Sequence, residues 1–163
     1  MSPIDNPIVR RFIEDAGSAT QALGVGRVLG QIYGYLYFSP EPRTLDDMKD
    51  ALGISKGSAS MGVRQLEQWG AVQRVWVKGD RKDYYTANDY FGRIMRSLMM
   101  DVMGKRLESM AQLLDAADAE LTVKNGSGNG NNKFIHDRVQ RLRLFQKKIQ
   151  NLWNNPLVKV MMK

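Results

Sequence analysis

The residues best suited to binding chemistry lie between Ser55 and Lys82, where small polar, glycine and basic side chains recur at short spacings. Lys56, Ser60 and Arg64 are four residues apart, so on a helix they share one face. Small hydroxyl side chains allow close approach to DNA, and an arginine can donate two hydrogen bonds to guanine or to phosphate. We expect this face to enter the major groove of double-stranded DNA, although a solvated polar helix face is an alternative. The residues expected to contact DNA here are Ser55, Lys56, Gly57, Ser58, Ser60, Met61 and Arg64.

A second basic group occurs at Lys78-Gly79-Asp80-Arg81-Lys82, a composition typical of a hairpin tip. The valine-rich stretch 72–77 predicts the strand before the tip, and residues 83–87 predict the returning strand. A basic hairpin beside a basic helix is the layout of a winged helix-turn-helix domain. We therefore expect Lys78, Arg81 and Lys82 to contact the sugar-phosphate backbone or the minor groove. Alternatively, the glycine and aspartate only form the turn, and the basic side chains are merely exposed.

The helices that would position these residues have clear start and stop signals. Thr44 is a favourable N-cap, and Asp46-Asp47 place negative charge in the first turn, where the helix dipole favours it. Gly53 predicts the end of that helix. Ser55 predicts the start of the next helix, and Gly70 predicts its end. The side chains expected to face the core are Leu45, Met48 and Leu52 on the first helix and Ala59, Val63, Leu66 and Gly70 on the second.

Two further helices are predicted before this motif. Asn6-Pro7 is a capping residue followed by a proline, which predicts a helix start, and Gly17 predicts its end. Thr20 predicts the start of a second helix that extends to Phe38. The proline-containing stretch 39–42 then separates this helix from the helix-turn-helix motif.

The second of these helices carries Gly26, Gly30 and Gly34 at four-residue spacing. Each glycine inside a helix costs about 1 kcal/mol relative to alanine, so such a ridge suggests a purpose. We expect it to let another helix approach closely. The alternative is that the glycines leave room for a quaternary ammonium ligand, held by cation–π attraction. The aromatic residues available for that are Tyr33, Tyr35, Tyr37 and Phe38.

Asp89 predicts the start of a long helix that extends to Leu121, about 50 Å at 1.5 Å per residue. Because so small a domain cannot bury a helix of this length, we expect a second copy of the chain to cover part of it. The first apolar stripe is expected to pack on the winged domain, and the second has the heptad spacing of helix–helix contacts. The stripes consist of Phe91, Met95, Leu98 and Val102, and of Met103, Leu107, Met110, Leu114, Ala117 and Leu121.

Residues 124–132 are polar and rich in glycine and asparagine, which predicts a flexible linker. A further amphipathic helix is predicted from Lys133 to Trp153. Dimerisation is the favoured role for this arm, with phosphate contact and membrane-surface binding as alternatives. Its apolar face comprises Ile135, Val139, Leu142, Phe145, Ile149 and Leu152 or Trp153, and its other face comprises Lys133, Arg138, Arg141, Arg143, Lys147 and Lys148.

Three stretches resemble the GbsR branch of the MarR-type transcriptional regulators. They are Ser55-Lys56-Gly57-Ser58-Ala59-Ser60, Arg64-Gln65-Leu66-Glu67-Gln68-Trp69-Gly70 and Gly79-Asp80-Arg81-Lys82-Asp83-Tyr84-Tyr85. The resemblance covers the winged-helix half, and the flanking helices by layout only. It implies a dimeric DNA-binding regulator with its N-terminal helix packed across the dimer, and some members respond to small ligands. It also implies that Asp80 orients Arg81 in the wing.

The charge distribution agrees with a polyanionic partner. The net charge is +7 and the sequence pI is about 9.7. Residues 55–82 hold six basic and two acidic side chains, and residues 133–163 hold eight and one. The basic excess therefore lies in the expected recognition helix, in its wing and in the C-terminal arm.

Catalysis has little support in the sequence. The chain has no cysteine, and its one histidine, His136, has no acidic cluster around it. Zinc-ligand spacings, a glycine-rich phosphate loop and a nucleophile motif are all missing from the sequence. We therefore expect no enzyme, no metal and no cofactor. The sequence shows no signal peptide or membrane-spanning run, so we expect a cytoplasmic protein that does not enter a membrane.

The sequence thus predicts a mainly α chain with a small β-wing, a winged helix-turn-helix with long helical dimerisation arms. The expected parts are N-terminal helices at 1–38, the DNA-binding domain at 39–88, the long helix at 89–123, the linker at 124–132 and a dimerisation helix with a tail at 133–163. We expect a sequence-specific transcriptional regulator, a repressor, that acts as a homodimer on a pseudo-palindromic operator and responds to a small effector. The alternatives are an architectural DNA-binding protein without sequence preference and a winged-helix module for protein–protein contact.

Overall fold

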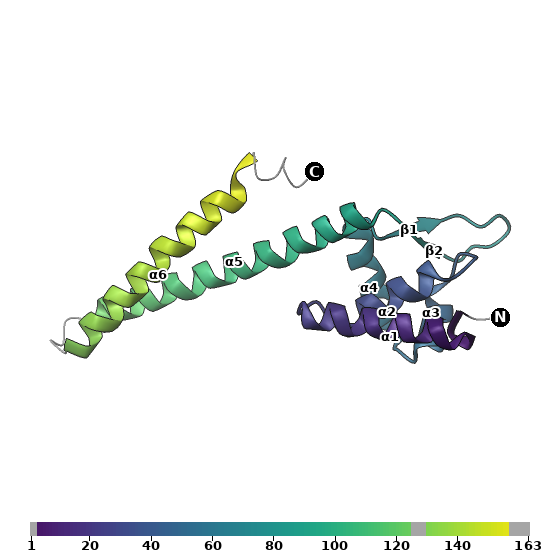
Figure 1. Cartoon of the computed structure of the whole chain (residues 1–163), viewed down its shortest axis with the longest axis horizontal. Coiled ribbons are helices and arrows are strands. Elements are labelled where there is room, and N and C mark those ends of the chain that lie inside the picture. Colours follow the sequence, from purple (N-terminus) through teal and green to yellow (C-terminus); the bar gives the residue numbers. More distant parts are fainter. Residues whose placement is uncertain (1–2, 125–129, 157–163) are drawn as a thin grey trace. The chain divides into compact units, whose positions relative to one another are not determined.

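A computed structural model of the chain describes residues 3–124 and 130–156, of which it gives the backbone alone at 123–124 and 130–131. It forms two compact units, Met1–Val102 and Met103–Lys163, here called the N-terminal and C-terminal units. The elements are η1 (Pro3–Asp5), α1 (Pro7–Ala22), α2 (Arg27–Tyr37), α3 (Leu45–Leu52), α4 (Lys56–Gln68), β1 (Val72–Val75), β2 (Tyr84–Ala87), α5 (Phe91–Lys124) and α6 (Gly130–Asn154) (Figure 1). The fold is therefore mainly helical with one small sheet, as predicted.

The boundary between α1 and α2 differs from the prediction. The Asn6 side chain caps α1 as expected, because its oxygen accepts a hydrogen bond from the Ile8 backbone N–H at 2.9 Å. However, α1 does not end at Gly17 and Thr20 does not cap a helix. The chain turns instead between α1 and α2, where Gly24 and Gly26 have φ angles of +77° and +101°. These left-handed values favour glycine and break the helix.

Helix α1 continues past Gly17 because Gly17 and Thr20 both pack against α2. Gly17 is buried, and a Cβ atom built on it would lie 2.8 Å from Cγ of Gln31. The Thr20 hydroxyl lies 3.2 Å from the Ala16 carbonyl, to which it donates, and accepts a hydrogen bond from the Gly30 backbone N–H at 3.2 Å. A backbone N–H in α2 thus finds its partner on α1.

The predicted glycine ridge is confirmed at two of its three positions. A Cβ atom on Gly30 would lie 2.0 Å from the carbonyl oxygen of Ala16, and one on Gly34 would lie 3.2 Å from Cα of Ile13. Gly26 precedes α2 and serves the turn instead. The ridge therefore lets α1 and α2 approach each other backbone to backbone.

The helix-turn-helix motif forms as its capping signals predict. The Thr44 hydroxyl accepts a hydrogen bond from the Asp47 backbone N–H at 3.2 Å, and the Asp47 carboxylate accepts one from the Thr44 backbone N–H at 2.8 Å. This reciprocal capping box starts α3. Gly53 ends it with a φ of +65°, and the Ser55 hydroxyl caps α4 by accepting from the Ser58 backbone N–H at 3.0 Å.

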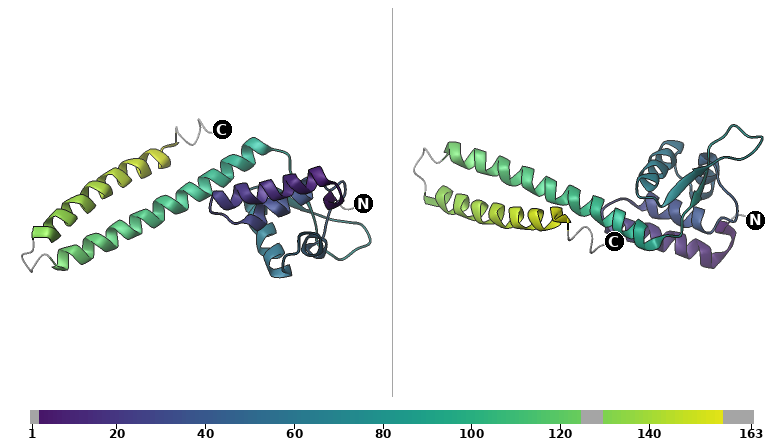
Figure 2. Two further views of the ribbon diagram at one scale, coloured as in Figure 1. Left: turned by 60° about the horizontal axis from the view of Figure 1, so that its bottom comes forward. Right: turned by 90° about the horizontal axis from the view of Figure 1, so that it is seen from above.

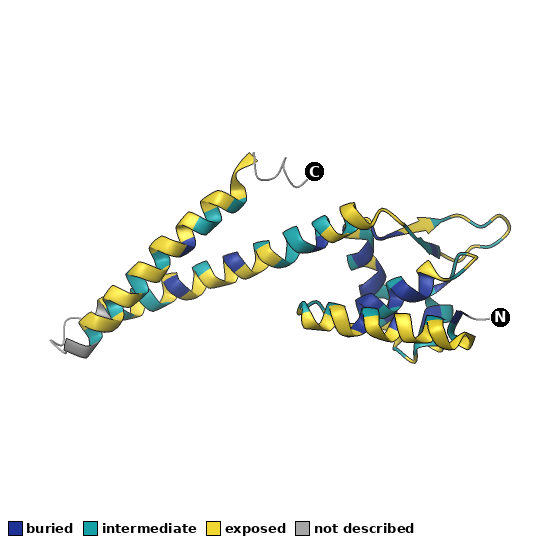
Figure 3. Cartoon of the chain, viewed as in Figure 1, coloured by how far each residue is buried: buried dark blue, intermediate teal, exposed yellow. Residues whose placement is uncertain are grey.

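The core of the N-terminal unit lies where α2, α3 and α4 meet. Ile32, Leu36, Met48 and Val63 are its largest fully buried side chains, and the buried positions of Figure 3 gather on these helices. Gly62 permits the contact between α2 and α4, since a Cβ atom there would lie 2.6 Å from Cδ1 of Ile32. The core fixes which face of α4 remains open.

The wing is an antiparallel hairpin in which Val72 pairs with Ala87 and Val75 with Tyr84. An isolated bridge between Arg43 and Tyr85 ties β2 to the segment before α3. The first strand was predicted to reach Val77 but ends at Val75. Figures 1 and 2 show the loop that joins β1 to β2 reaching beyond the helices of the N-terminal unit.

Helix α5 begins two residues after the predicted start at Asp89, and its predicted first stripe is only partly buried. Leu98 is 6 % exposed and belongs to the core, and Val102 packs against it. Phe91 and Met95 are 52 % and 54 % exposed, so half of the stripe lies outside the core. Among the described residues, no helix is both long and apolar enough to cross a membrane.

In the C-terminal unit, α6 runs beside the second part of α5 (Figure 2), where Leu107 and Leu114 of the predicted second stripe are buried and polar groups make further contacts. The Arg143 guanidinium contacts the carboxylates of Asp115 and Asp118 at 2.7 and 2.6 Å. Asp118 also accepts a hydrogen bond from Gln140, and its carboxylate lies 3.3 Å from Nε2 of His136. The linker predicted at 124–132 lies outside the described residues at 125–129, and the prediction is wrong at its ends, because residue 124 belongs to α5 and residues 130–132 belong to α6.

These contacts correct the predicted faces of the C-terminal helix. Arg143 was expected on the outer basic face but is half-buried against α5, because two carboxylates neutralise it there. The predicted apolar face is instead largely exposed within a single chain. Its exposed members include Ile135, Leu142, Phe145 and Leu152, which are 40 %, 48 %, 59 % and 62 % exposed.

Candidate nucleic-acid interface

The outward face of α4 is open along its length. Met61 is 74 % exposed at its centre, with exposed Lys56 and Arg64 on either side. Ser60 is half-buried beside them. A Cβ atom built on Gly57 would have one neighbour within 4 Å, the Ser55 hydroxyl at 3.8 Å. The start of α4 therefore carries little bulk, which suits close approach to a nucleic acid.

Ser55 and Ser58 are partly committed to the helix cap. The Ser55 hydroxyl accepts from the Ser58 backbone N–H and lies 2.8 Å from the Ser58 hydroxyl. Each hydroxyl oxygen still has capacity for a further hydrogen bond. Ser55 thus positions the first turn of α4 in addition to any contact that it makes itself.

An acidic residue that the sequence assigned only to a helix start lies beside this surface. The Asp46 carboxylate is 2.9 Å from Nζ of Lys56. That hydrogen bond is the largest cause of a lowered pKa for Asp46, and the charges of Lys56, Lys49 and Lys82 lower the pKa further. Lys56 at the start of α4 therefore pairs with this carboxylate, and the charge of Lys82 in the wing makes a smaller contribution.

Hydrogen bonds to the Asp80 side chain stabilise the turn of the wing. The Asp80 carboxylate accepts hydrogen bonds from the Lys82 backbone N–H at 3.0 Å and from the Tyr84 hydroxyl at 2.8 Å. These two bonds are the main causes of the lowered pKa of Asp80. Asp80 thus holds the turn, and a backbone hydrogen bond from Arg81 also lowers the pKa of Asp80. That Asp80 orients the Arg81 side chain, as the resemblance implies, stays a prediction. Lys78, Arg81 and Lys82 are exposed around the turn, as expected for residues that meet DNA.

Arg74 extends the basic surface into β1. Its guanidinium contacts the Asp83 carboxylate at 3.3 Å and lies 5.7 Å from the centre of the Tyr85 ring. Trp76 follows β1 and is 85 % exposed. Neither residue was predicted to have a binding role. The alternation of the strand gave no sign of how exposed Trp76 would be, because the strand ends one residue earlier.

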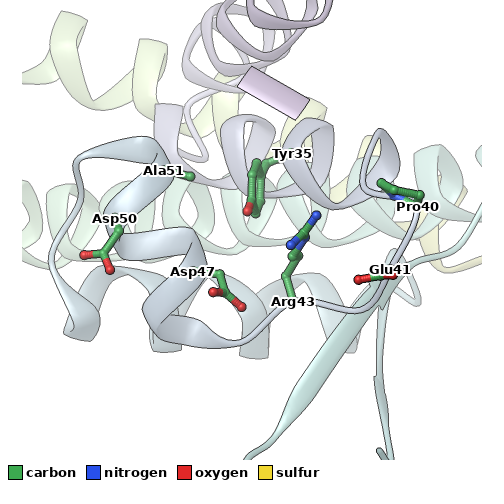
Figure 4. Close-up of a pocket in the computed structure, with 7 residues that line it drawn as sticks. All are labelled: Tyr35, Pro40, Glu41, Arg43, Asp47, Asp50 and Ala51. Carbon is green, nitrogen blue, oxygen red and sulfur yellow. The ribbon is translucent and has the colours of Figure 1, made fainter. Parts of the chain in front are cut away.

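A pocket of about 580 Å³ lies in the N-terminal unit, between the end of α2 and α3 (Figure 4). Figure 4 shows the Arg43 side chain directed toward Tyr35, with Asp47 and Asp50 on α3 nearby. Three carboxylates and one guanidinium line the pocket, so it does not belong to the basic surface. Its lining residues are Tyr35, Pro40, Glu41, Arg43, Asp47, Asp50 and Ala51.

The aromatic residues considered for a quaternary ammonium site do not converge on one cavity. Tyr35 lines the acidic pocket, whereas the Tyr33 and Tyr37 rings stack with centroids 6.0 Å apart. Phe91 contacts Tyr37 edge to face at 5.4 Å. Burial raises the pKa of Tyr33 to about 12, and its hydroxyl donates to the Asn88 carbonyl at 2.8 Å. Tyr33, Tyr37 and Phe91 therefore form one cluster of rings apart from Tyr35, and Tyr37 and Phe91 remain 41 % and 52 % exposed in it.

The amino-acid sequence is similar to those of known HTH-type transcriptional regulators. No protein-family profile matches the chain. It is 29 % identical over 116 residues to the HTH-type transcriptional regulator MmpR5 of Mycobacterium tuberculosis, covering 71 % of this chain and 66 % of that protein. It is 30 % identical over 121 residues to YvaV of Bacillus subtilis, named as an HTH-type transcriptional regulator, covering 68 % and 67 %. It is 28 % identical to the HTH-type transcriptional repressor GbsR of Bacillus subtilis, covering 69 % and 62 %.

The matched part thus spans about two thirds of the length of these relatives or slightly less. The crystal structure of a transcriptional regulator has the same fold, with a TM-score of 0.55 and 24 % identity over 96 % of this chain and 100 % of that one. The capped helix pair, the open face of α4 and the basic wing agree with these matches. The chain belongs to the HTH-type transcriptional regulators, as its relatives YvaV and GbsR do.

Proposed function

We propose that this regulator represses transcription as a homodimer that binds a pseudo-palindromic operator. In each protomer, α4 enters a major groove and the wing contacts the adjacent backbone or minor groove. The observation that carries the proposal is the open face of α4, with Met61 at 74 % exposure between exposed Lys56 and Arg64. The relative GbsR is itself named a repressor, which supports repression here.

The proposed contacts have different roles. Met61 and Arg64 face the base edges, with Lys56, Ser58 and Ser60 beside them. Gly57 clears space for the phosphate backbone. Lys78, Arg81 and Lys82 neutralise phosphates, which contributes affinity without sequence preference.

The proposed dimer rests on apolar surface that a single chain leaves uncovered. Ile8 and Phe12 on α1 are 67 % and 56 % exposed. On α6 the exposed stripe comprises Ile135, Leu142, Phe145 and Leu152. An apolar face on a charged helix is expected to be covered by another chain. A second copy supplies the same faces and supports the two-fold symmetry of an operator.

The experiment that tests the function begins with selection of bound sequences from a random duplex library. Fluorescence anisotropy then compares the selected duplex with a scrambled one across a salt series. A regulator should bind the selected duplex at least 1,000-fold more tightly, roughly the lower end of specific recognition. Two chains should bind per site.

Other outcomes would support the alternatives. Equal binding to both duplexes with a steep salt dependence would indicate an architectural DNA-binding protein. Absence of binding even at low salt would favour a winged-helix module for protein contact. The exposed basic residues of α6 give the architectural alternative its support. They are Lys133, Arg138, Arg141, Lys147 and Lys148.

A small effector, a non-enzymatic role and a cytoplasmic location complete the proposal. In the acidic pocket of Figure 4, Asp47 caps α3 and Asp50 pairs with Lys49, so Glu41 is the carboxylate proposed to meet an organic cation. A thermal-shift screen with quaternary ammonium compounds tests this. A rise in Tm that Glu41→Gln abolishes would support the pocket as the effector site.

A further inference from the structure

Trp76 is the most exposed large apolar side chain in the described part of the chain, at 85 %. Trp69, the C-cap of α4, is in contrast 6 % exposed, and its indole N–H donates to the Asp101 carboxylate at 3.2 Å. Tryptophan is enriched where a large amphipathic ring is covered by a binding partner. The exposed indole on a projecting hairpin is therefore a candidate binding residue.

The surroundings of Trp76 are cationic. Along the hairpin it lies between Arg74 and Lys78, and the wing continues to Arg81 and Lys82. The acidic residues of the hairpin are already engaged. Asp80 accepts from the Lys82 backbone N–H and the Tyr84 hydroxyl, and Asp83 contacts the Arg74 guanidinium. A partner that covers the indole must also tolerate these cations.

We propose that Trp76 is a DNA-binding residue of the wing, where its indole packs against the sugars and base edges of the minor groove. The inference rests on the proposed function. DNA can both cover the indole and face the cations of the wing, because its deoxyriboses offer apolar surface and its phosphates offer negative charge. A second copy of this chain suits the site less well, since two basic wings would repel each other. Other proteins that bind the minor groove also place apolar side chains in it.

This role differs from that of the basic wing residues in a measurable way. An indole neutralises no phosphate and releases no counterion, so its removal leaves the salt dependence of binding unchanged. Removal of Arg81 lowers the salt slope. Stacking and sugar contacts also tolerate many sequences, so Trp76 adds affinity for selected and scrambled duplexes alike.

The test compares the wild type with Trp76→Ala and Trp76→Phe in the anisotropy experiment on both duplexes. Trp76→Ala should bind each duplex about 10-fold more weakly with an unchanged salt slope, and Trp76→Phe should lie between. Tyr90→Ala is the matched control, because Tyr90 is a 57 % exposed aromatic residue outside the wing. It should bind as the wild type does.

Acrylamide quenching provides a second measurement. The difference between wild-type and Trp76→Phe emission isolates Trp76, and DNA should protect that signal from the quencher. If Trp76→Ala binds both duplexes as tightly as the wild type, or if the difference signal is quenched equally with and without DNA, the inference is wrong while the proposed function stands. If the wild type binds neither duplex at low salt, both fail.

Discussion

Two carboxylates hold the basic residues of the candidate DNA surface in place. Asp46 contacts Lys56 at the start of α4, and Asp80 holds the turn that carries Arg81 and Lys82. A carboxylate repels phosphate, so neither acidic group is expected to bind DNA itself. Their influence acts through the neighbouring cations, and each can be removed without disturbing the core.

Asp46→Asn is predicted to tighten DNA binding about threefold for both duplexes. The substitution frees Lys56 from an exposed ion pair and removes a negative charge beside the phosphates. Anisotropy at fixed salt measures the change. In a Lys56→Gln background the gain should largely disappear, since a coupled pair gives a non-additive double-mutant cycle.

The matched control for that prediction is Asp50→Asn. Asp50 lies on the same helix, is paired with Lys49 at 3.0 Å, and its substitution changes the net charge equally. Its effect on DNA affinity should be smaller than that of Asp46→Asn. An equal gain from both variants would show that only net charge matters and that the contact with Lys56 has no role.

Asp80→Ala is predicted to loosen the wing turn and to speed hydrogen exchange at the Lys82 amide at neutral pH. The hydrogen bonds of the turn lower the pKa of Asp80, so their stabilisation is present above the ordinary carboxyl pKa. It is lost as pH falls through the lowered folded-state value. The difference between wild type and variant should therefore vanish in strong acid. Asp83→Ala, which breaks only the Arg74 contact, should leave the Lys82 amide protected.

The contact between α1 and α2 decides how the N-terminal elements pack. Gly30 lies against the Ala16 carbonyl, and its own backbone N–H donates to the Thr20 hydroxyl. The two helices therefore touch through their backbones, where a side chain cannot rotate away. A single methyl group added at Gly30 would therefore push α1 and α2 apart.

Gly30→Ala is predicted to lower the free energy of unfolding by at least about 3 kcal/mol, because backbone atoms cannot give way to the added Cβ. Urea denaturation measures the change. Gly92→Ala is the control on α5, where an added Cβ atom would meet nothing within 4 Å. It should leave stability unchanged or raise it by up to about 1 kcal/mol. Equal stability of the two variants would contradict the close approach of α1 and α2.

The whole molecule combines a well-packed N-terminal unit with a C-terminal helix pair in which buried Leu107 and Leu114 lie among polar contacts. Within that pair Asp118 contacts Gln140 and Arg143, and Gln146 is 3 % exposed. The apolar stripe of α6 remains outside these contacts. Its exposure within one chain is the reason to expect a second copy.

Leu142→Glu is predicted to weaken self-association at least about tenfold, because a carboxylate would be buried without a partner in the dimer. Sedimentation measures the effect at micromolar concentration. Leu144→Glu introduces the same charge on α6 at a 63 % exposed position that faces away from Leu142. It should remain dimeric. Dimers of unchanged stability in both variants would rule out this stripe as the interface.

The sequence alone determined the elements whose signals are local. Thr44, Ser55 and Gly53 predicted the start and end of the helix-turn-helix helices, because a cap and its partner lie within four residues. The exposure of Lys56 and Arg64 on α4, and of Lys78, Arg81 and Lys82 on the wing, follows from the same local patterns. The family resemblance rested on these stretches too.

Only the tertiary structure decided features that depend on residues distant in sequence. Thr20 lies within α1, where its hydroxyl accepts a hydrogen bond from the Gly30 backbone N–H on α2. Asp46 contacts Lys56 because α3 and α4 pack side by side. Arg143 lies against α5 because its guanidinium pairs with the carboxylates of Asp115 and Asp118. Periodicity assigns a residue to a face of its own helix, but it does not say which faces meet. That choice depends on which pairs of faces close-pack and neutralise each other's charges, and this is settled only when the whole chain folds.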